Sequence, residues 1–146
     1  MGLLVNSRAL TADQLLRLPS PVLLCAKRDD FTKAILEAGI QTVSVNLPLA
    51  KELVGQPVSE ILTNVTATAV RLMPDGLPVF LTDYEMLFDP RYNLDVIKLF
   101  CEIARHNKLI VKWCGSFDGD SLVYSEPGYD DYAKYIVSEY EITCVI

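Results

Sequence analysis

The stretch Leu77–Pro90, LPVFLTDYEMLFDP, carries the pattern on which the rest of the fold depends. Within it, Pro78–Leu81 is a short, continuous apolar run with turn residues before it and Asp83 after it. Such a run predicts a buried central strand of a parallel sheet. Polar residues at the carboxyl end of that strand then lie where open α/β sheets bind their ligands, and an acid there holds Mg²⁺ in P-loop NTPases. Asp83 and Glu85 are therefore the first candidate site residues.

Outward from this stretch, strand and helix patterns alternate along the chain, and the first 20 residues contain one short leading helix. Further strands are predicted at residues 22–25, 41–46, 109–114 and 141–146, with helices at 29–38, 47–54, 58–73 and 94–106. Residues 113–125 read as a small hairpin, and residues 129–138 as a helix or an ordered loop. This order predicts an α/β, three-layer sandwich with a mostly parallel central sheet and a small C-terminal hairpin, in one domain spanning residues 1–146.

Composition narrows the classes of function. The 146 residues are 51% hydrophobic and 22% charged, with a formal net charge of -6, which argues against a uniformly basic nucleic-acid surface. The four cysteines form no CxxC pair and there is one histidine, so we expect reduced thiols and no zinc site. Neither a signal peptide nor a membrane span is recognisable in the sequence, and the chain is expected to be cytoplasmic, without a membrane partner.

A nucleotide-binding protein of this class needs a phosphate loop between its first strand and first helix. Here that segment is CAKRDDFTK, residues 25–33, which contains no glycine. Asp29 and Asp30 stand where phosphate oxygens would have to lie, and repulsion between anions is costly. Lys27, Thr32 and Lys33 could still meet an anion, so ATP binding through an atypical loop stays an alternative to no cofactor at all.

The acids after the central strand have two interpretations. Asp83 could hold Mg²⁺ with Glu85 activating a water, or Asp83 could cap the end of the strand with Glu85 facing solvent. Near the end of a later helix, Arg105 could reach a neighbouring subunit as an arginine finger does, or simply complement the helix dipole. His106 has no acid–base partner nearby in the sequence.

Three segments together resemble a known family: LPVFLTDYEMLFDP, LDVIKLFCEIARHNKLIVKWCGSF and LVYSEPGYDDY. They are similar to the small P-loop-containing BrxF proteins of type 3 BREX phage-defence systems, over residues 22–135. The resemblance implies a P-loop NTPase-like fold, with Lys27–Lys33 at the Walker A position and Thr82–Glu85 at the Walker B position. The family's G-K-[ST] is missing here, which puts hydrolysis in doubt but not membership of an assembly.

Three hypotheses follow for the function. The first is a cytoplasmic defence-system subunit with a degenerate Walker A, not an enzyme, that acts through contacts with other defence proteins or with itself and meets nucleic acid only indirectly. The second is a small Mg²⁺-dependent ATPase with Lys27 or Lys33 on phosphate and Asp83 and Glu85 on the metal side. The third is a nucleic-acid-binding accessory protein.

Overall fold

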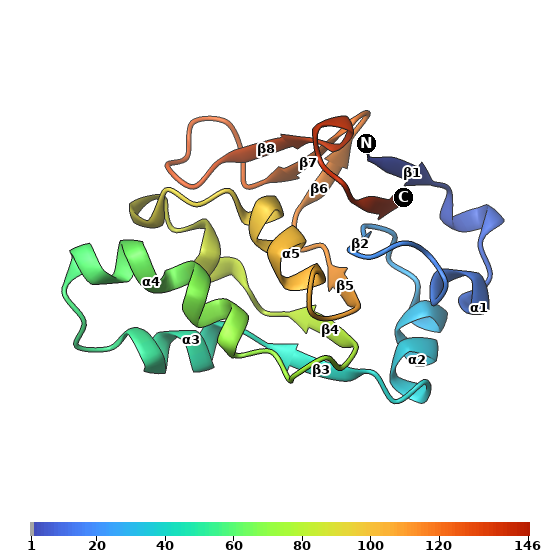
Figure 1. Cartoon of the computed structure of the whole chain (residues 1–146). Coiled ribbons are helices and arrows are strands. Elements are labelled where there is room, and N and C mark those ends of the chain that lie inside the picture. Colours follow the sequence, from blue (N-terminus) through green and yellow to red (C-terminus); the bar gives the residue numbers. More distant parts are fainter. Residues whose placement is uncertain (1) are drawn as a thin grey trace.

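Six parallel strands form the central sheet of the computed structural model, which describes residues 2–146 (Figure 1). The strands lie in the order β1-β9-β2-β5-β4-β3, and every neighbouring pair is parallel. Their bounds are β1 Leu3–Val5, β2 Val22–Leu24, β3 Gln41–Ser44, β4 Val79–Thr82, β5 Leu109–Lys112 and β9 Thr143–Val145. The expected mostly parallel α/β sheet is confirmed, and β4, from the opening stretch, is buried beside β5 near its middle.

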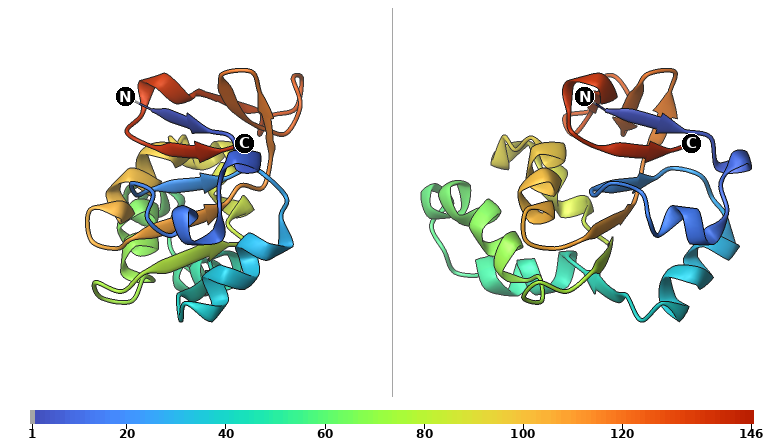
Figure 2. Two further views of the ribbon diagram at one scale, coloured as in Figure 1. Left: turned by 90° about the vertical axis from the view of Figure 1, so that its right-hand side faces the viewer. Right: turned by 45° about the vertical axis from the view of Figure 1, so that its right-hand side comes forward.

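Helices cover both faces of this sheet (Figures 1 and 2). On one face α1 (Ala12–Leu15) and α2 (Asp29–Glu37) bury Leu15, Phe31 and Ile35 against Val22, Leu24, Phe80 and Ile110. On the other face lie α3 (Asn46–Leu53), α4 (Val58–Arg71) and α5 (Val96–Ala104), packed against Leu23, Val79, Leu81 and Val111. Alternate residues of each strand thus feed opposite cores, which is the period-2 pattern of a doubly covered sheet.

The C-terminal third differs from the sequence-based expectation. Instead of a hairpin alone, β6 (Ser116–Asp118), β7 (Ser121–Tyr124) and β8 (Ala133–Ile136) form a separate antiparallel sheet in that order. The helix or loop predicted for residues 129–138 is therefore wrong over β8. Its alternation is disguised because Ile136 is exposed while Tyr135 is buried, so apolar residues lie on both sides of the strand. Strand β1 was also not expected from the sequence.

Four short 3-10 helices complete the chain: η1 Ser7–Ala9, η2 Glu85–Phe88, η3 Pro90–Tyr92 and η4 Val137–Glu139. Helix α1 begins with a capping box between Thr11 and Gln14, as its sequence predicts. Helix α2 is different, because its N-cap is Arg28, with no side-chain cap, while Asp29 and Asp30 occupy the first turn. The negative charges of the two aspartates therefore interact favourably with the helix dipole, but neither side chain caps the helix.

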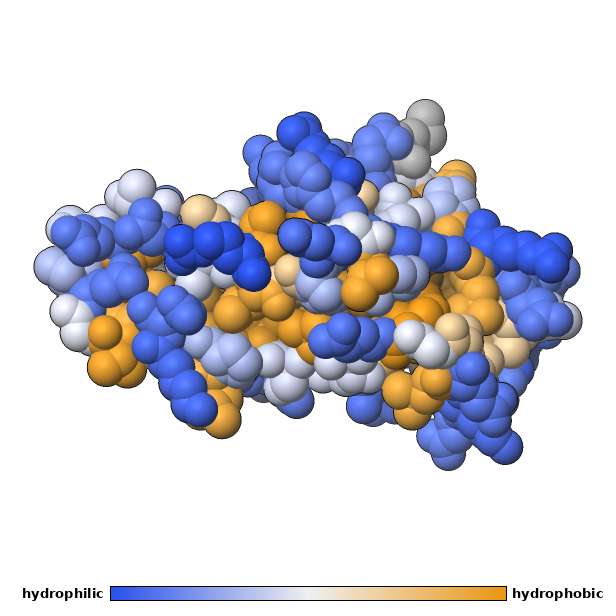
Figure 3. Space-filling view, turned by 60° about the horizontal axis from the view of Figure 1, so that its bottom comes forward, coloured by the Kyte–Doolittle hydropathy of each residue, from blue (hydrophilic) through white to orange (hydrophobic). Residues whose placement is uncertain are grey.

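The edge strand β3 lies on the lower side of the molecule in Figure 1. Figure 3 brings that side forward and shows hydrophobic residues exposed between hydrophilic ones. The large exposed apolar side chains between residues 29 and 78 include Leu36, Leu47, Val54 and Leu77. Among residues 2–146, no helix has both the length and the apolar character needed to cross a membrane.

Candidate functional site

A cavity of about 530 Å³ opens at the carboxyl ends of β2, β4 and β5. The residues around it come from these strand ends and from the start of α2. They are Leu24, Cys25, Ala26, Lys27, Arg28, Asp29, Thr32, Thr82, Asp83, Glu85, Lys112, Trp113 and Cys114.

The position of this cavity follows from the way the chain leaves each strand. After β2 the chain enters α2, whose Phe31 and Ile35 belong to one core. After β4 and β5 it enters η2 and the antiparallel sheet, whose Leu87 and Leu122 belong to the core on the other face. Neighbouring strands with connections on opposite faces leave a crevice between their carboxyl ends, where open α/β sheets bind ligands.

The loop after β2 is short and its backbone is already engaged. Only Cys25–Arg28 separate β2 from α2. The N–H groups of Cys25 and Ala26 both donate to the Val145 carbonyl of β9, at 2.9 and 3.0 Å. A phosphate loop is longer, and it cradles phosphates with free backbone N–H groups. Two of the four N–H groups in this loop are therefore turned toward the sheet and away from any ligand.

Arg28 fixes the end of this loop to the rest of the molecule. Its Nε donates to Asp30 Oδ1 at 2.9 Å, and its Nη1 donates to the Ser7 carbonyl at 2.6 Å. The guanidinium also lies 4.0 Å from the centroid of the Phe31 ring, which is a cation–π arrangement. The Arg28 guanidinium lowers the pKa of Asp30. Although Arg28 borders the cavity, its charge is committed to these structural partners.

The turn after β4 is held in the opposite manner, with its acids presented to the cavity. Asp83 has a φ of 49°, a left-handed conformation in which Asp is better tolerated than most residues. Its carbonyl accepts from the N–H groups of Val45 and Asn46 at 3.1 and 2.6 Å, and its Oδ2 accepts from Ser44 Oγ at 2.8 Å. The end of β3 therefore positions this carboxylate.

Glu85 is positioned by the same segment of chain. Asn46 Nδ2 donates to Glu85 Oε2 at 2.8 Å, and Asn46 Oδ1 accepts from the Met86 N–H at 3.0 Å. Between the two acids, Tyr84 is fully buried, and its hydroxyl donates to the Lys112 carbonyl at 2.7 Å while accepting from the Cys114 N–H at 3.0 Å. Tyr84 thus ties the acidic turn to the end of β5.

The structure brings four of the sequence-predicted site residues to one cavity: Lys27, Thr32, Asp83 and Glu85. The other two lie elsewhere. Lys33 is exposed on α2 with its Nζ 3.9 Å from Glu37, and Arg105 is exposed next to Glu102 at the end of α5. Because α5 ends just before β5 begins, Arg105 lies at the amino edge of the sheet, away from its own chain's cavity.

Sequence reasoning missed further residues of the site. Lys112 lines the cavity from the end of β5, and its place at the carboxyl end of an apolar strand was a usable signal. Ser44 ends β3 and Asn46 lies just after it, and they orient the two acids. Of the two aspartates that the sequence placed where phosphate oxygens would lie, Asp29 borders the cavity, so a carboxylate faces the space that an anion would enter.

The two thiols on the cavity wall are poor nucleophiles. A hydrogen bond with Cys144 and burial raise the pKa of the Cys25 thiol, and burial raises the pKa of Cys114 to about 11. Thiols of this kind stay protonated near neutral pH, and it is the thiolate that attacks or binds metals.

The fit to a magnesium nucleotide is therefore partial. Asp83 and Glu85 offer two carboxylates with hard oxygen atoms, the type that Mg²⁺ takes in phosphate sites. Lys27 and Lys112 make no ion pair within residues 2–146 and can meet an anion. A group of three or more His, Cys, Asp or Glu residues able to hold a metal is not found in that range. The backbone cradle for phosphate is not formed.

Comparison of the chain with protein-family models, with curated proteins and with solved structures found no match. The function is therefore argued from the site itself.

Proposed function

We propose that this chain is a P-loop NTPase-like subunit of a BREX-type phage-defence assembly that acts mainly through protein contacts. The arrangement of the cavity supports the P-loop kinship. A buried strand, β2, leads through a loop into a helix, and an acid at the end of another buried strand, β4, faces the same space. Phosphate loops and Walker B acids meet in this way in P-loop NTPases. The resemblance to the BrxF family supports the defence setting.

One observation carries the emphasis on protein contacts: the Val145 carbonyl holds the N–H groups of Cys25 and Ala26. A triphosphate in this cavity would find two fewer donors and the Asp29 carboxylate at its border. Since phosphate binding at a helix N-terminus depends on those donors, tight ATP binding is not expected.

The alternative is a Mg²⁺-dependent ATPase with an atypical loop. The observation in its favour is that Lys27, Asp83 and Glu85 line one cavity, with Lys112 in addition. In that case Lys27 and Lys112 would bind phosphate and Asp83 would hold the metal. Turnover would then depend on Glu85 orienting the attacking water.

Calorimetric titration of the chain with ATP, with and without Mg²⁺, separates the two proposals. For the protein-contact function we expect no binding tighter than about 1 mM, which is about −4 kcal/mol. Micromolar binding that disappears in Lys27→Ala and in Asp83→Ala would overturn it in favour of the ATPase. Lys33→Ala is the matched control, because Lys33 carries the same charge as Lys27 but lies further along the chain on α2 and does not line the cavity.

The assembly itself is tested by affinity purification of the tagged chain from the cells that encode it, followed by mass spectrometry. We expect other defence proteins to co-purify, among them a methyltransferase and a large phosphatase-like protein encoded nearby. Recovery of the chain alone, together with unchanged phage plating after its gene is deleted, would contradict the proposed function.

A further inference from the structure

Two strands, β1 and β3, form the edges of the parallel sheet. Strand β1 lies beside η4 of the C-terminal segment. Strand β3 lies at the other edge, on the side that Figure 3 brings forward, and its Gln41, Thr42 and Ser44 are exposed. The edge formed by β3 is therefore accessible to the backbone of another chain.

The backbone of β3 alternates between groups that bond to β4 and groups that point away from it. The Val45 N–H donates to the Thr82 carbonyl at 3.1 Å, and in a parallel ladder only every second residue bonds to the same neighbour. Val43 and Val45 therefore bond to β4, whereas Thr42 and Ser44 point their N–H and C=O groups outward. These four groups meet no hydrogen-bond partner within residues 2–146.

The sequence of this edge contains none of the features that usually prevent strand pairing. Edge strands are commonly protected by charged residues, by proline or by a bulge. Residues 40–45, IQTVSV, contain no charged residue and no proline, and the pairing of β3 with β4 is regular. Leu36 and Leu47 on the flanking helices, and Leu77 just before β4, are each more than half exposed. The edge thus combines free backbone groups with apolar surroundings.

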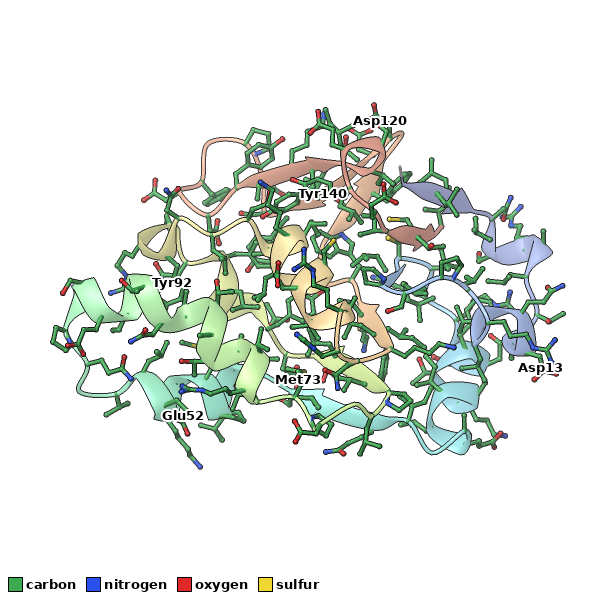
Figure 4. All side chains as sticks on the ribbon, viewed as in Figure 1. Asp13, Glu52, Met73, Tyr92, Asp120 and Tyr140 are labelled. Atoms are coloured by element: carbon green, nitrogen blue, oxygen red, sulfur yellow. The ribbon has the colours of Figure 1, made fainter. Side chains whose placement is uncertain are left out.

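The distribution of charge indicates which partner can approach this edge. A net charge of -6 tends to keep copies of a chain apart, but residues 115–146, with seven acids and one lysine, carry all of it. In residues 1–114 acidic and basic side chains are equal in number. The sheet β6-β7-β8 of the acidic segment lies on the side of the molecule opposite β3 in Figure 1, and Figure 4 labels Asp120 on that side. Two copies that meet at β3 therefore keep their acidic segments apart.

We infer that β3 pairs antiparallel with β3 of a second copy of this chain, with the two-fold axis at Val43. In this register Thr42 of each copy lies opposite Ser44 of the other, and each such pair exchanges two N–H···O bonds. All four outward groups of each copy are then bonded, and Val43 lies against its own counterpart across the axis. The contact is isologous, and it joins the two parallel sheets into one. This inference goes beyond the proposed function and does not depend on it.

Sedimentation equilibrium of the full chain, at concentrations from about 10 μM to 1 mM, tests the dimer. Because a four-residue edge makes a small contact, we expect a dissociation constant of about 100 μM. Thr42→Pro removes an outward N–H while leaving the bonds to β4 intact, and proline is tolerated at such edge positions. By symmetry it removes two of the four intermolecular bonds, so dimerisation should weaken about ten-fold or more.

Leu4→Pro is the matched control, because it removes an outward N–H from the other edge of the sheet. Leu3 and Val5 bond to β9, so the N–H of Leu4 between them points away from that strand. Dimerisation of Leu4→Pro should equal that of the unchanged chain. Circular dichroism of both variants verifies that each is folded before the masses are compared.

The register is tested separately by cross-linking. Val43→Cys should give a disulfide-linked dimer on non-reducing gels after oxidation with copper–phenanthroline, because residue 43 faces its counterpart across the axis. Gln41→Cys is the control, since it lies on the same face of the same strand but opposite Val45 of the second copy. It should cross-link no more than the unchanged chain does.

Several results would overturn the inference. A monomer at every concentration would mean that β3 is free or takes a strand from another protein. Equal losses in Thr42→Pro and Leu4→Pro, or equal cross-linking in the two cysteine variants, would mean that the copies meet elsewhere. None of these results affects co-purification of the chain with defence proteins, so the inference and the proposed function can fail independently.

Discussion

Two buried strands of one sheet, β2 and β4, end at the same cavity in segments of opposite character. The loop after β2 is four residues long, with two N–H groups bound to Val145 and its arginine bound to Asp30 and Ser7. The turn after β4 is held by neutral donors from Ser44 and Asn46, which leave one oxygen of each acid unbonded within residues 2–146. The polar groups of the loop after β2 are thus bound within the protein, whereas the turn after β4 presents carboxylate oxygens to the cavity.

The difference indicates which half of a nucleotide site can be built from this sequence. The metal half needs only positioned carboxylates, and side chains from β3 provide that positioning. The phosphate half needs a run of free backbone N–H groups, which in turn needs loop length and glycine. Neither is present between Leu24 and Asp29. The predictions below are arranged from the largest expected effect to the smallest.

Tyr84→Phe removes the hydroxyl whose hydrogen bonds tie the turn after β4 to the end of β5. This change leaves the Lys112 carbonyl and the Cys114 N–H without their buried partner, and we expect the free energy of unfolding to fall by about 1–3 kcal/mol. Urea denaturation followed by circular dichroism measures it. Tyr129→Phe is the control, because Tyr129 is 64% exposed and its hydroxyl should contribute almost nothing. Equal stability of the two variants would show that the turn does not depend on this tie.

The backbone of the same turn is tested by comparing Asp83→Gly with Asp83→Ala. Both lose the bond from Ser44, but only glycine adopts a φ of 49° without steric cost, so the glycine variant should be more stable by about 1 kcal/mol. Thermal or urea unfolding of the pair gives the difference directly. If alanine were the more stable, the left-handed conformation would not be imposed by the fold.

Whether the Asp29 carboxylate weakens phosphate binding is tested by Asp29→Asn. This change removes a carboxylate from the cavity border while keeping the size of the side chain. Affinity for magnesium pyrophosphate should rise by about three-fold, the scale of a single exposed charge interaction. Isothermal titration calorimetry checks the change, with Asp13→Asn on α1 as an exposed control outside the cavity. A lower affinity in Asp29→Asn would mean that Asp29 belongs to the metal half.

The smallest effect concerns acid. The bond from Arg28 lowers the pKa of Asp30, so this anchor is fully formed above the ordinary aspartate pKa and is lost as pH falls through the lowered value. Both side chains are exposed enough for solvent to screen most of the gain. In an NMR titration below about pH 4, we expect the Arg28 Nε–H signal to move. Asp30→Asn should remove the Arg28 transition.

Local patterns were enough to predict much of the fold. Continuous apolar runs gave β2, β4 and β5, and periodic apolar spacing gave α2 to α5, because burial on two faces leaves a strong signature. Two strands were not predicted: β1, whose Leu3 and Leu4 are half exposed at an edge, and β8, whose apolar residues lie on both sides. Their pairing is decided by tertiary neighbours that sequence periodicity does not report.

The candidate site was predictable where it depends on residue type and unpredictable where it depends on distant backbone. Asp83, Glu85 and Lys27 follow strands and could be placed at one edge of the sheet. That the Val145 carbonyl, 120 residues away, would take the N–H of Cys25 could not be read from any local pattern. Long-range hydrogen bonds of this kind decide whether a loop is a cradle or a fixed connection.

The short helix η2 has a consequence for how the molecule behaves as a whole. Its first residue, Glu85, borders one cavity, while Leu87 and Phe88 border a second cavity of about 500 Å³ beside the antiparallel sheet. A single turn of backbone is therefore the common wall of both spaces. If a ligand in one space shifts this wall and changes the affinity of the other space, a ligand in the other space changes the affinity of the first by the same factor, since thermodynamic linkage between two sites is reciprocal.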